Sequence, residues 1–117
     1  MTRMLVAIAA TTALLALTVA APATGATKLV ATVGPGFTIT LKKAGKKVTS
    51  LRAGTYTITV QDKARSHNFH LKGPGVNKDS GVSRTGTMTW RVKLKRGKYT
   101  YVCDPHASSM RGTFTVK

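Results

Sequence analysis

Apolar and polar residues alternate with a period of two along most of the chain that follows residue 26. Seven segments show this alternation and are rich in Thr, Val, Ile, Tyr and Phe: 28–33, 37–43, 54–63, 66–73, 87–95, 98–103 and 112–117. Clusters of Gly, Pro, Asn and Lys separate them, and no stretch keeps a helical period for more than one turn. Short alternating strands of this kind predict an all-β sandwich or barrel. The longest loop is expected between Lys72 and Gly86.

Alternation also predicts which side chains face the core, because successive residues of a strand point to opposite faces of the sheet. In segment 98–103 the buried set should be the aromatic one: Tyr99, Tyr101 and Cys103. In segment 66–73 the inward set is expected to be His67, Phe69 and Leu71. Asn68 and His70 then face outward or sideways. The pattern therefore favours His67 over His70 for a site near the core.

Residues 1–26 have the features of an export signal. Arg3 gives a positive start, residues 4–21 are apolar or uncharged, and small residues precede two candidate cleavage sites, after Ala23 and after Ala26. We expect cleavage after Ala26 and export to the medium, the periplasm or the cell envelope. Residues 27–117 then form one domain, since such a length supports a single core. An uncleaved membrane anchor is the alternative, because the uncharged stretch approaches the roughly 20 residues that span a bilayer.

The charge is strongly positive. Lys and Arg number 19 against 3 acidic residues, a formal net charge of +16, which becomes +15 once Arg3 leaves with the signal. Such an imbalance bears on partners rather than on fold. The basic side chains can coat outward strand faces and hinder aggregation, or attract an anionic cell-surface polymer or membrane headgroups. No strand face interleaves aromatic residues with arginine, so we expect no specific nucleic-acid binding.

Cys103 is the only cysteine of the chain, although cysteines of exported domains normally pair. It is therefore a metal ligand, a reactive thiol, an intermolecular link or a buried bystander. His106 and Met110 follow it in a turn between two predicted strands. With His67 they supply one thiolate, two imidazoles and one thioether, a set typical of electron-transfer copper, whereas zinc more often recruits several cysteines or a carboxylate. A catalytic thiol at Cys103 and a core role for Met110 stay open as alternatives.

The motifs "SHN" at 66–68 and "YVCDPHASSM" at 101–110, followed by a last strand, resemble the plastocyanin and pseudoazurin group of cupredoxins. The resemblance covers nearly all of residues 27–117. It implies a cupredoxin-like Greek-key β-sandwich of eight strands with one blue-copper ion at one end. The ligands that it implies are His67, Cys103, His106 and Met110. It also implies that Asn68, beside the first histidine, tethers the two ligand-bearing segments.

Together these features lead us to expect an exported mononuclear blue-copper protein that carries single electrons and is not an enzyme. His106, in the turn, should be the ligand nearest solvent and the exit for the electron. Plastocyanins have an acidic docking patch, but this chain is basic, so the expected redox partner is acidic; the domain itself is expected to be monomeric. The alternatives are a copper-storage or copper-delivery protein of the cell envelope, and an adhesion domain with a vestigial site.

Overall fold

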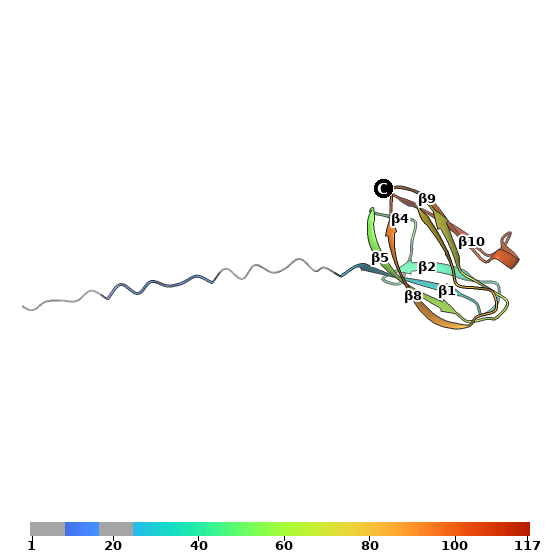
Figure 1. Ribbon diagram of the computed structural model, residues 1–117, viewed down its shortest axis with the longest axis horizontal. Coiled ribbons are helices and arrows are strands. Elements are labelled where there is room, and N and C mark those ends of the chain that lie inside the picture. Colours follow the sequence, from blue (N-terminus) through green and yellow to red (C-terminus); the bar gives the residue numbers. More distant parts are fainter. Residues whose placement is uncertain (1–8, 17–24) are drawn as a thin grey trace, which may run out of the picture.

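The computed structural model describes residues 9–16 and 25–117, and from residue 27 onward these form a sandwich of two five-stranded sheets (Figure 1). The first sheet has the order β3 (Lys46–Lys47), β2 (Ile39–Lys43), β1 (Thr27–Val33), β5 (Gly54–Asp62) and β8 (Gly86–Leu94). The second has the order β4 (Ser50–Leu51), β10 (Arg111–Val116), β9 (Gly97–Val102), β6 (His70–Gly73) and β7 (Val76–Asp79). The only helical segment in the described part of the chain is the 3₁₀ turn η1 (Asp104–His106). The all-β sandwich that the alternation predicted is confirmed.

Strand directions define two ends of the sandwich. β1 runs parallel to β5, while β2 and β8 run antiparallel to them. In the other sheet β9 runs antiparallel to β6 and β10, and β10 pairs in parallel with β4. β5 and β9 both stop at the end that carries η1, which we call the η1 end. The opposite end, where β1 and β9 begin, we call the far end (Figure 1).

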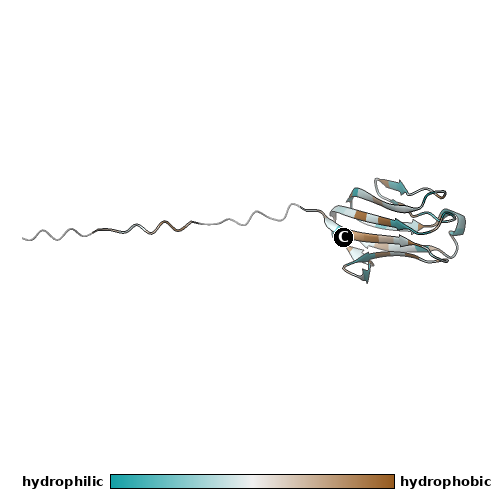
Figure 2. Ribbon diagram, turned by 90° about the horizontal axis from the view of Figure 1, so that it is seen from below, coloured by the Kyte–Doolittle hydropathy of each residue, from teal (hydrophilic) through white to brown (hydrophobic). Residues whose placement is uncertain are grey.

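The core follows the predicted alternation, which is visible as alternating hydrophilic and hydrophobic bands along the strands in Figure 2. Tyr99, Tyr101 and Cys103 are all buried, as expected. The ring of Tyr99 stacks on Phe114 with centroids 5.2 Å apart, and Tyr101 stacks on Phe69 at 5.3 Å. Burial of such large rings dominates the energetics of a small core.

Two glycines make room for these rings on neighbouring strands. A Cβ on Gly112 would lie 2.2 Å from the ring of Tyr101, and one on Gly73 would lie 2.1 Å from the ring of Tyr99. Any side chain at either position would displace a buried aromatic residue. Glycine is therefore required for packing on both strands that flank β9, at Gly112 of β10 and at Gly73 of β6.

Three strand predictions were incomplete or wrong. β7 lies inside the segment 72–86 that was expected to be a loop, because its sequence has a single half-buried apolar residue and no alternation; pairing with β6 holds it. The two-residue strands β3 and β4 were not predicted. The described residues contain ten strands, and β3 and β4 are the difference from the eight that the resemblance implied. The strand expected at 66–73 starts only at His70.

Asn68 was expected to face outward or sideways, and that prediction is wrong, since its side chain is fully buried. The cause is local: residues 67–69 precede β6 and have no strand geometry, so alternation does not apply to them. His67, Asn68 and Phe69 are consecutive buried residues.

Most of the expected export signal, residues 1–8 and 17–24, lies outside the described residues, so the signal and its cleavage stay predictions. Among residues 9–16 and 25–117, none belongs to a helix that is long and apolar enough to cross a membrane.

Candidate metal centre

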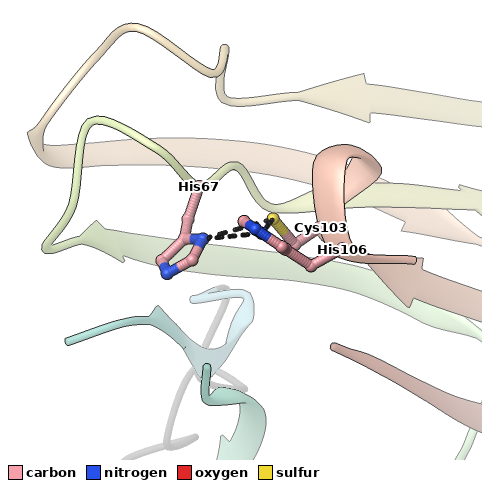
Figure 3. Close-up of side chains that lie close together, drawn as sticks. All are labelled: His67, Cys103 and His106. Atoms are coloured by element: carbon pink, nitrogen blue, oxygen red, sulfur yellow. Dashed lines mark hydrogen bonds between the residues drawn. The ribbon is translucent and has the colours of Figure 1, made fainter. Parts of the chain in front are cut away.

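Three potential ligand atoms converge at the η1 end (Figure 3). The Nδ1 atoms of His67 and His106 are 3.1 Å apart, and the Sγ atom of Cys103 lies 3.6 Å from the first and 3.5 Å from the second. Cys103 and His67 are buried, while His106 is half-buried. The structure thus brings together a thiol and two imidazoles that lie 36 and 3 residues apart in the sequence.

Each of these side chains comes from a segment that follows a core strand. His67 lies in the loop after β5, and Cys103 directly follows β9. His106 closes η1, which Pro105 favours because its ring fixes φ near the helical value. The two strands belong to different sheets, so the cluster joins the layers of the sandwich at one end.

Backbone hydrogen bonds close the turn from Cys103 to Met110 on itself. The N–H of Cys103 donates to the carbonyl of Met110 at 2.9 Å, and the N–H of Met110 donates to the carbonyl of His106 at 2.8 Å. The N–H of His106 donates in turn to the carbonyl of Cys103 at 3.0 Å. Met110 is fully buried. The turn therefore fixes the three ligand candidates that it contains relative to one another.

Asn68 ties the His67 segment to this turn, as the resemblance implied. Its side-chain carbonyl accepts the backbone N–H of Asp104 at 2.7 Å, and its amide donates to Asp104 Oδ2 at 2.7 Å and to Asp79 Oδ1 at 2.8 Å. A buried amide with three partners satisfies the rule that buried polar groups are hydrogen-bonded. The expected tether is confirmed. The hydrogen bond to Asp79 also connects Asn68 to the end of β7.

His70 lies outside the cluster, which agrees with the preference for His67. Its Nδ1 is 2.8 Å from Asp104 Oδ2, and its Nε2 contacts the side chain of Asn77. Partial burial raises the pKa of Asp104, but hydrogen bonds from Asn68 and His70 and the charges of His70 and Lys72 outweigh burial and hold this pKa below its ordinary value. His70, Asp79 and Asp104 also group closely enough to hold an ion, yet His70 already contacts Asp104 directly and both carboxylates accept from Asn68.

Phe37 is a component of the site that the sequence did not suggest. Its ring meets His106 edge to face with centroids 4.9 Å apart, and meets His67 at 5.7 Å. It is nonetheless 67% exposed. The position was assigned to a strand, but β2 begins at Ile39, so Phe37 belongs to the turn that covers the histidines. An aromatic residue directly after Gly-Pro-Gly is the signal that could have indicated it.

Asp62, at the end of β5, is a buried carboxylate near the cluster. Its Oδ1 accepts the N–H of Ala64 at 3.1 Å, while its Oδ2 has no hydrogen-bond partner. Burial raises the pKa of Asp62, and the hydrogen bond from Ala64 and the charge of His67 offset only part of that effect. The ionised form of this group is therefore disfavoured in the folded protein.

The donor set fits a transition-metal ion. Three N and S atoms held about 2.0–2.3 Å from one ion, at angles near those of a trigonal or tetrahedral site, are separated by roughly 3.1–3.7 Å. The separations of 3.1, 3.5 and 3.6 Å fall in that range. No carboxylate takes part in this cluster of the described residues. A single thiolate with two imidazoles suits copper better than a structural zinc site.

Comparison with solved structures finds the same fold in rusticyanin. The chain is 26% identical to rusticyanin from Thiobacillus ferrooxidans, with a TM-score of 0.56, over 77% of this chain and 76% of that one. Reduced rusticyanin is 24% identical to the chain, with a TM-score of 0.58, over 77% of this chain and 78% of that one. A chain of a heme-copper terminal oxidase shares the fold at 21% identity and a TM-score of 0.54, over 77% of this chain and 63% of that one. No curated protein sequence gives a significant match.

A family model described as copper binding proteins, plastocyanin/azurin family, matches residues 38–117. That span is more than half of the chain, and it contains the complete histidine and cysteine cluster. The arrangement of His67, Cys103, His106 and Met110 fits one mononuclear copper ion, which is the cofactor. Because the match and the cluster coincide in this way, the chain belongs to the plastocyanin/azurin family of copper-binding proteins, the cupredoxins.

Proposed function

We propose that this protein is an exported blue-copper protein that carries single electrons between redox partners. The observation that supports this most is the convergence of Cys103 Sγ with the Nδ1 atoms of both histidines at 3.5 and 3.6 Å, with Cys103 fully buried. The copper ion, when bound, supplies a one-electron redox couple. The proposed ligands are His67, Cys103, His106 and Met110, with Met110 as the weak axial thioether.

The surrounding chain holds these ligands in place. Cys103 serves as a thiolate and both histidines as neutral imidazoles that offer Nδ1. The closed Cys103–Met110 turn and the Asn68 tether leave the ligands little freedom to rearrange. Burial of Cys103 and His67 keeps water away from them. A pre-arranged, dry site of this kind is what rapid electron exchange with little reorganisation requires.

Electrons would enter and leave through His106, the one histidine of the cluster that is half-exposed. Around it, Phe37, Pro105 and Ala107 are exposed and apolar. An apolar surface beside the exposed imidazole allows a partner to approach closely and exclude water. We propose that a redox partner docks there and that the protein acts as a monomeric carrier rather than as an enzyme.

Repeated redox cycling distinguishes this function from copper delivery. Purified copper-loaded protein is reduced and reoxidised many times in the presence of a copper chelator, and its copper content is measured after each cycle. A carrier retains its ion because the ligands hold it in both oxidation states. Progressive loss of copper on reduction would contradict the proposal and favour a delivery protein.

A matched pair of variants tests the exit route. Phe37→Leu keeps an apolar residue over His106 and should leave electron exchange with a small soluble oxidant nearly unchanged. Phe37→Glu places a charge against the imidazole and should slow exchange with a negatively charged oxidant. Equal rates in both variants would show that electrons do not pass this surface.

A further inference from the structure

Acidic side chains occur only at the η1 end. Asp62 ends β5, Asp79 ends β7 and Asp104 follows β9, and these are the three acidic residues of the whole chain. Four basic residues lie at the same end, Lys63, Arg65, Arg84 and Arg111, and two more, Lys72 and Lys78, lie on β6 and β7 near Asp104 and Asp79. The acidic residues offset part of the positive charge there, and most of the positive charge of the protein lies elsewhere.

Four exposed lysines form one hairpin at the far end. Lys42 lies directly opposite Lys47, and Lys43 lies opposite Lys46, across the β2–β3 ladder. The connecting residues Ala44 and Gly45 have φ angles of 48° and 78°, so they make a tight turn that brings the lysines together in two pairs, one on each face of the hairpin. Like charges directly opposite on a sheet destabilise it. A hairpin with this arrangement gains stability when an anion neutralises it.

Seven further basic residues, all exposed, extend this charge over the far end. Four lie in the corner between β8 and β9, and the others begin β1, follow β4 and end the chain: Lys93, Lys95, Arg96, Lys98, Lys28, Arg52 and Lys117. With the hairpin they make eleven basic side chains, which we call the far-end surface. The one ion pair found among the described residues, between His70 and Asp104, lies at the η1 end. No basic side chain of the far-end surface has an acidic side chain to pair with.

Within this surface a groove of about 580 Å³ is lined by Lys43, Arg52 and Lys117 together with Ser50 and Thr55. Two lysines and an arginine around one depression, beside two residues that carry hydroxyl groups, suit phosphate oxygens. The groove thus offers a place for an individual phosphate group within a broadly cationic surface.

We propose that the far-end surface docks on anionic phospholipid headgroups of a membrane. Lipid is favoured over a soluble polymer because residues 4–21, which are apolar or uncharged, precede β1, and β1 begins at the far end (Figure 1). While that segment is inserted in a membrane, before its expected cleavage, the far-end surface faces the headgroups, and the charge of this surface then keeps the cleaved domain on them. Docking directs the η1 end, with His106, away from the bilayer. This inference does not rest on the electron-transfer function, because it depends only on charge and topology.

Binding of the copper-loaded sandwich domain, residues 27–117 without the apolar signal, to vesicles tests the proposal. Vesicles of phosphatidylcholine with phosphatidylglycerol are compared with pure phosphatidylcholine in a sedimentation assay, at low and at high salt. The protein should bind only the anionic vesicles and should be released when salt shortens the Debye length from about 10 Å to about 3 Å. Equal binding to both vesicles would show that apolar insertion, not the far-end surface, is responsible and would overturn the proposal.

Two quadruple variants of equal net charge separate location from total charge. Changing Lys42, Lys43, Lys46 and Lys47 to Gln should weaken binding about 600-fold, since each basic residue near an anionic leaflet contributes about fivefold. Changing Lys63, Arg65, Lys72 and Arg84, which lie outside the far-end surface, to Gln should weaken it less than about threefold. Similar losses in the two variants would overturn the proposal.

A double variant in the groove, Arg52→Gln with Lys117→Gln, is an independent test. It should also weaken vesicle binding, although it leaves the hairpin lysines in place. Near-ultraviolet circular dichroism verifies folding of every variant. Soluble polyphosphate is the competing ligand: tighter binding to it than to anionic vesicles would mean that a polymer is the partner and would overturn the assignment to lipid.

Discussion

Replacing Asn68 by Ala should cost the domain about 3 kcal/mol of stability. The side chain makes three hydrogen bonds, two to carboxylates of Asp79 and Asp104 and one from the backbone of Asp104. Bonds to charged groups contribute about 1.5–3 kcal/mol each, but both acids are exposed and regain water, so we count about 1 kcal/mol for each of the three. In a domain of this size the loss lowers the melting temperature by about 15 °C.

The measurement is urea unfolding of the copper-free protein at pH 7, followed by the fluorescence of Trp90, the only tryptophan. Asn68→Asp is the matched control, because it keeps the size and the acceptor oxygen but replaces the amide donor by a second carboxylate oxygen, which then faces the carboxylates of Asp79 and Asp104. It should be the less stable of the two variants at neutral pH and recover when acid protonates the cluster. A loss below about 1 kcal/mol in Asn68→Ala would refute the idea that this tether stabilises the site.

The pH dependence of the tether follows from Asp104. Its pKa is lowered in the folded protein, so its contribution to stability is fully present above the pKa of the unfolded chain. That contribution is lost as the pH falls through the lower, folded value. The stability difference between wild-type protein and Asn68→Ala should therefore shrink on acidification. A difference that grows in acid would contradict this account.

Three further predictions follow from single contacts. Gly112→Ala should destabilise the fold by about 2 kcal/mol, because its Cβ would overlap the ring of Tyr101; a melting temperature equal to that of wild type would contradict this packing. Asp62→Asn should stabilise the copper-free protein by about 1 kcal/mol at pH 7 and have no such effect below about pH 3. The raised pKa of Asp62 makes its ionised form destabilising as the pH rises. Unfolding after pH jumps measures this difference in stability, and a variant that is less stable than wild type at pH 7 would contradict the prediction. His67→Ala should abolish the blue absorption and His70→Ala should leave it nearly intact; the reverse would place the wrong histidine in the site.

Alternation predicted the long strands because their two faces differ in environment. β5 has one face in the core, so buried residues recur at every second position, and β9 follows the same period until Val102, which is also buried. β7 escaped detection because it lies at an edge of its sheet and exposes most of its side chains. Two-residue strands such as β3 carry no period at all. Edge position and length, rather than chemistry, limited the prediction of the fold.

The orientation of His67 was predicted correctly for a reason that does not hold. Alternation within a strand placed His67 inward and Asn68 outward, yet both lie in the loop before β6 and both are buried. Asn68 can be buried because Asp79 and Asp104 satisfy its amide, and such partners are not visible in a periodic pattern. The same applies to Phe37, whose contact with His106 depends on how the turn folds back.

Addition of Cu(II) to the purified protein, with Cys103→Ser as the comparison, tests the central claim that Cys103 is the thiolate ligand of a blue-copper site. The wild-type protein should bind one copper ion per chain and develop intense visible absorption from thiolate-to-copper charge transfer. The Cys103→Ser variant should keep its far-ultraviolet circular dichroism and lack this absorption. Undiminished colour in the variant, or copper-bound wild-type protein without colour, would contradict the account.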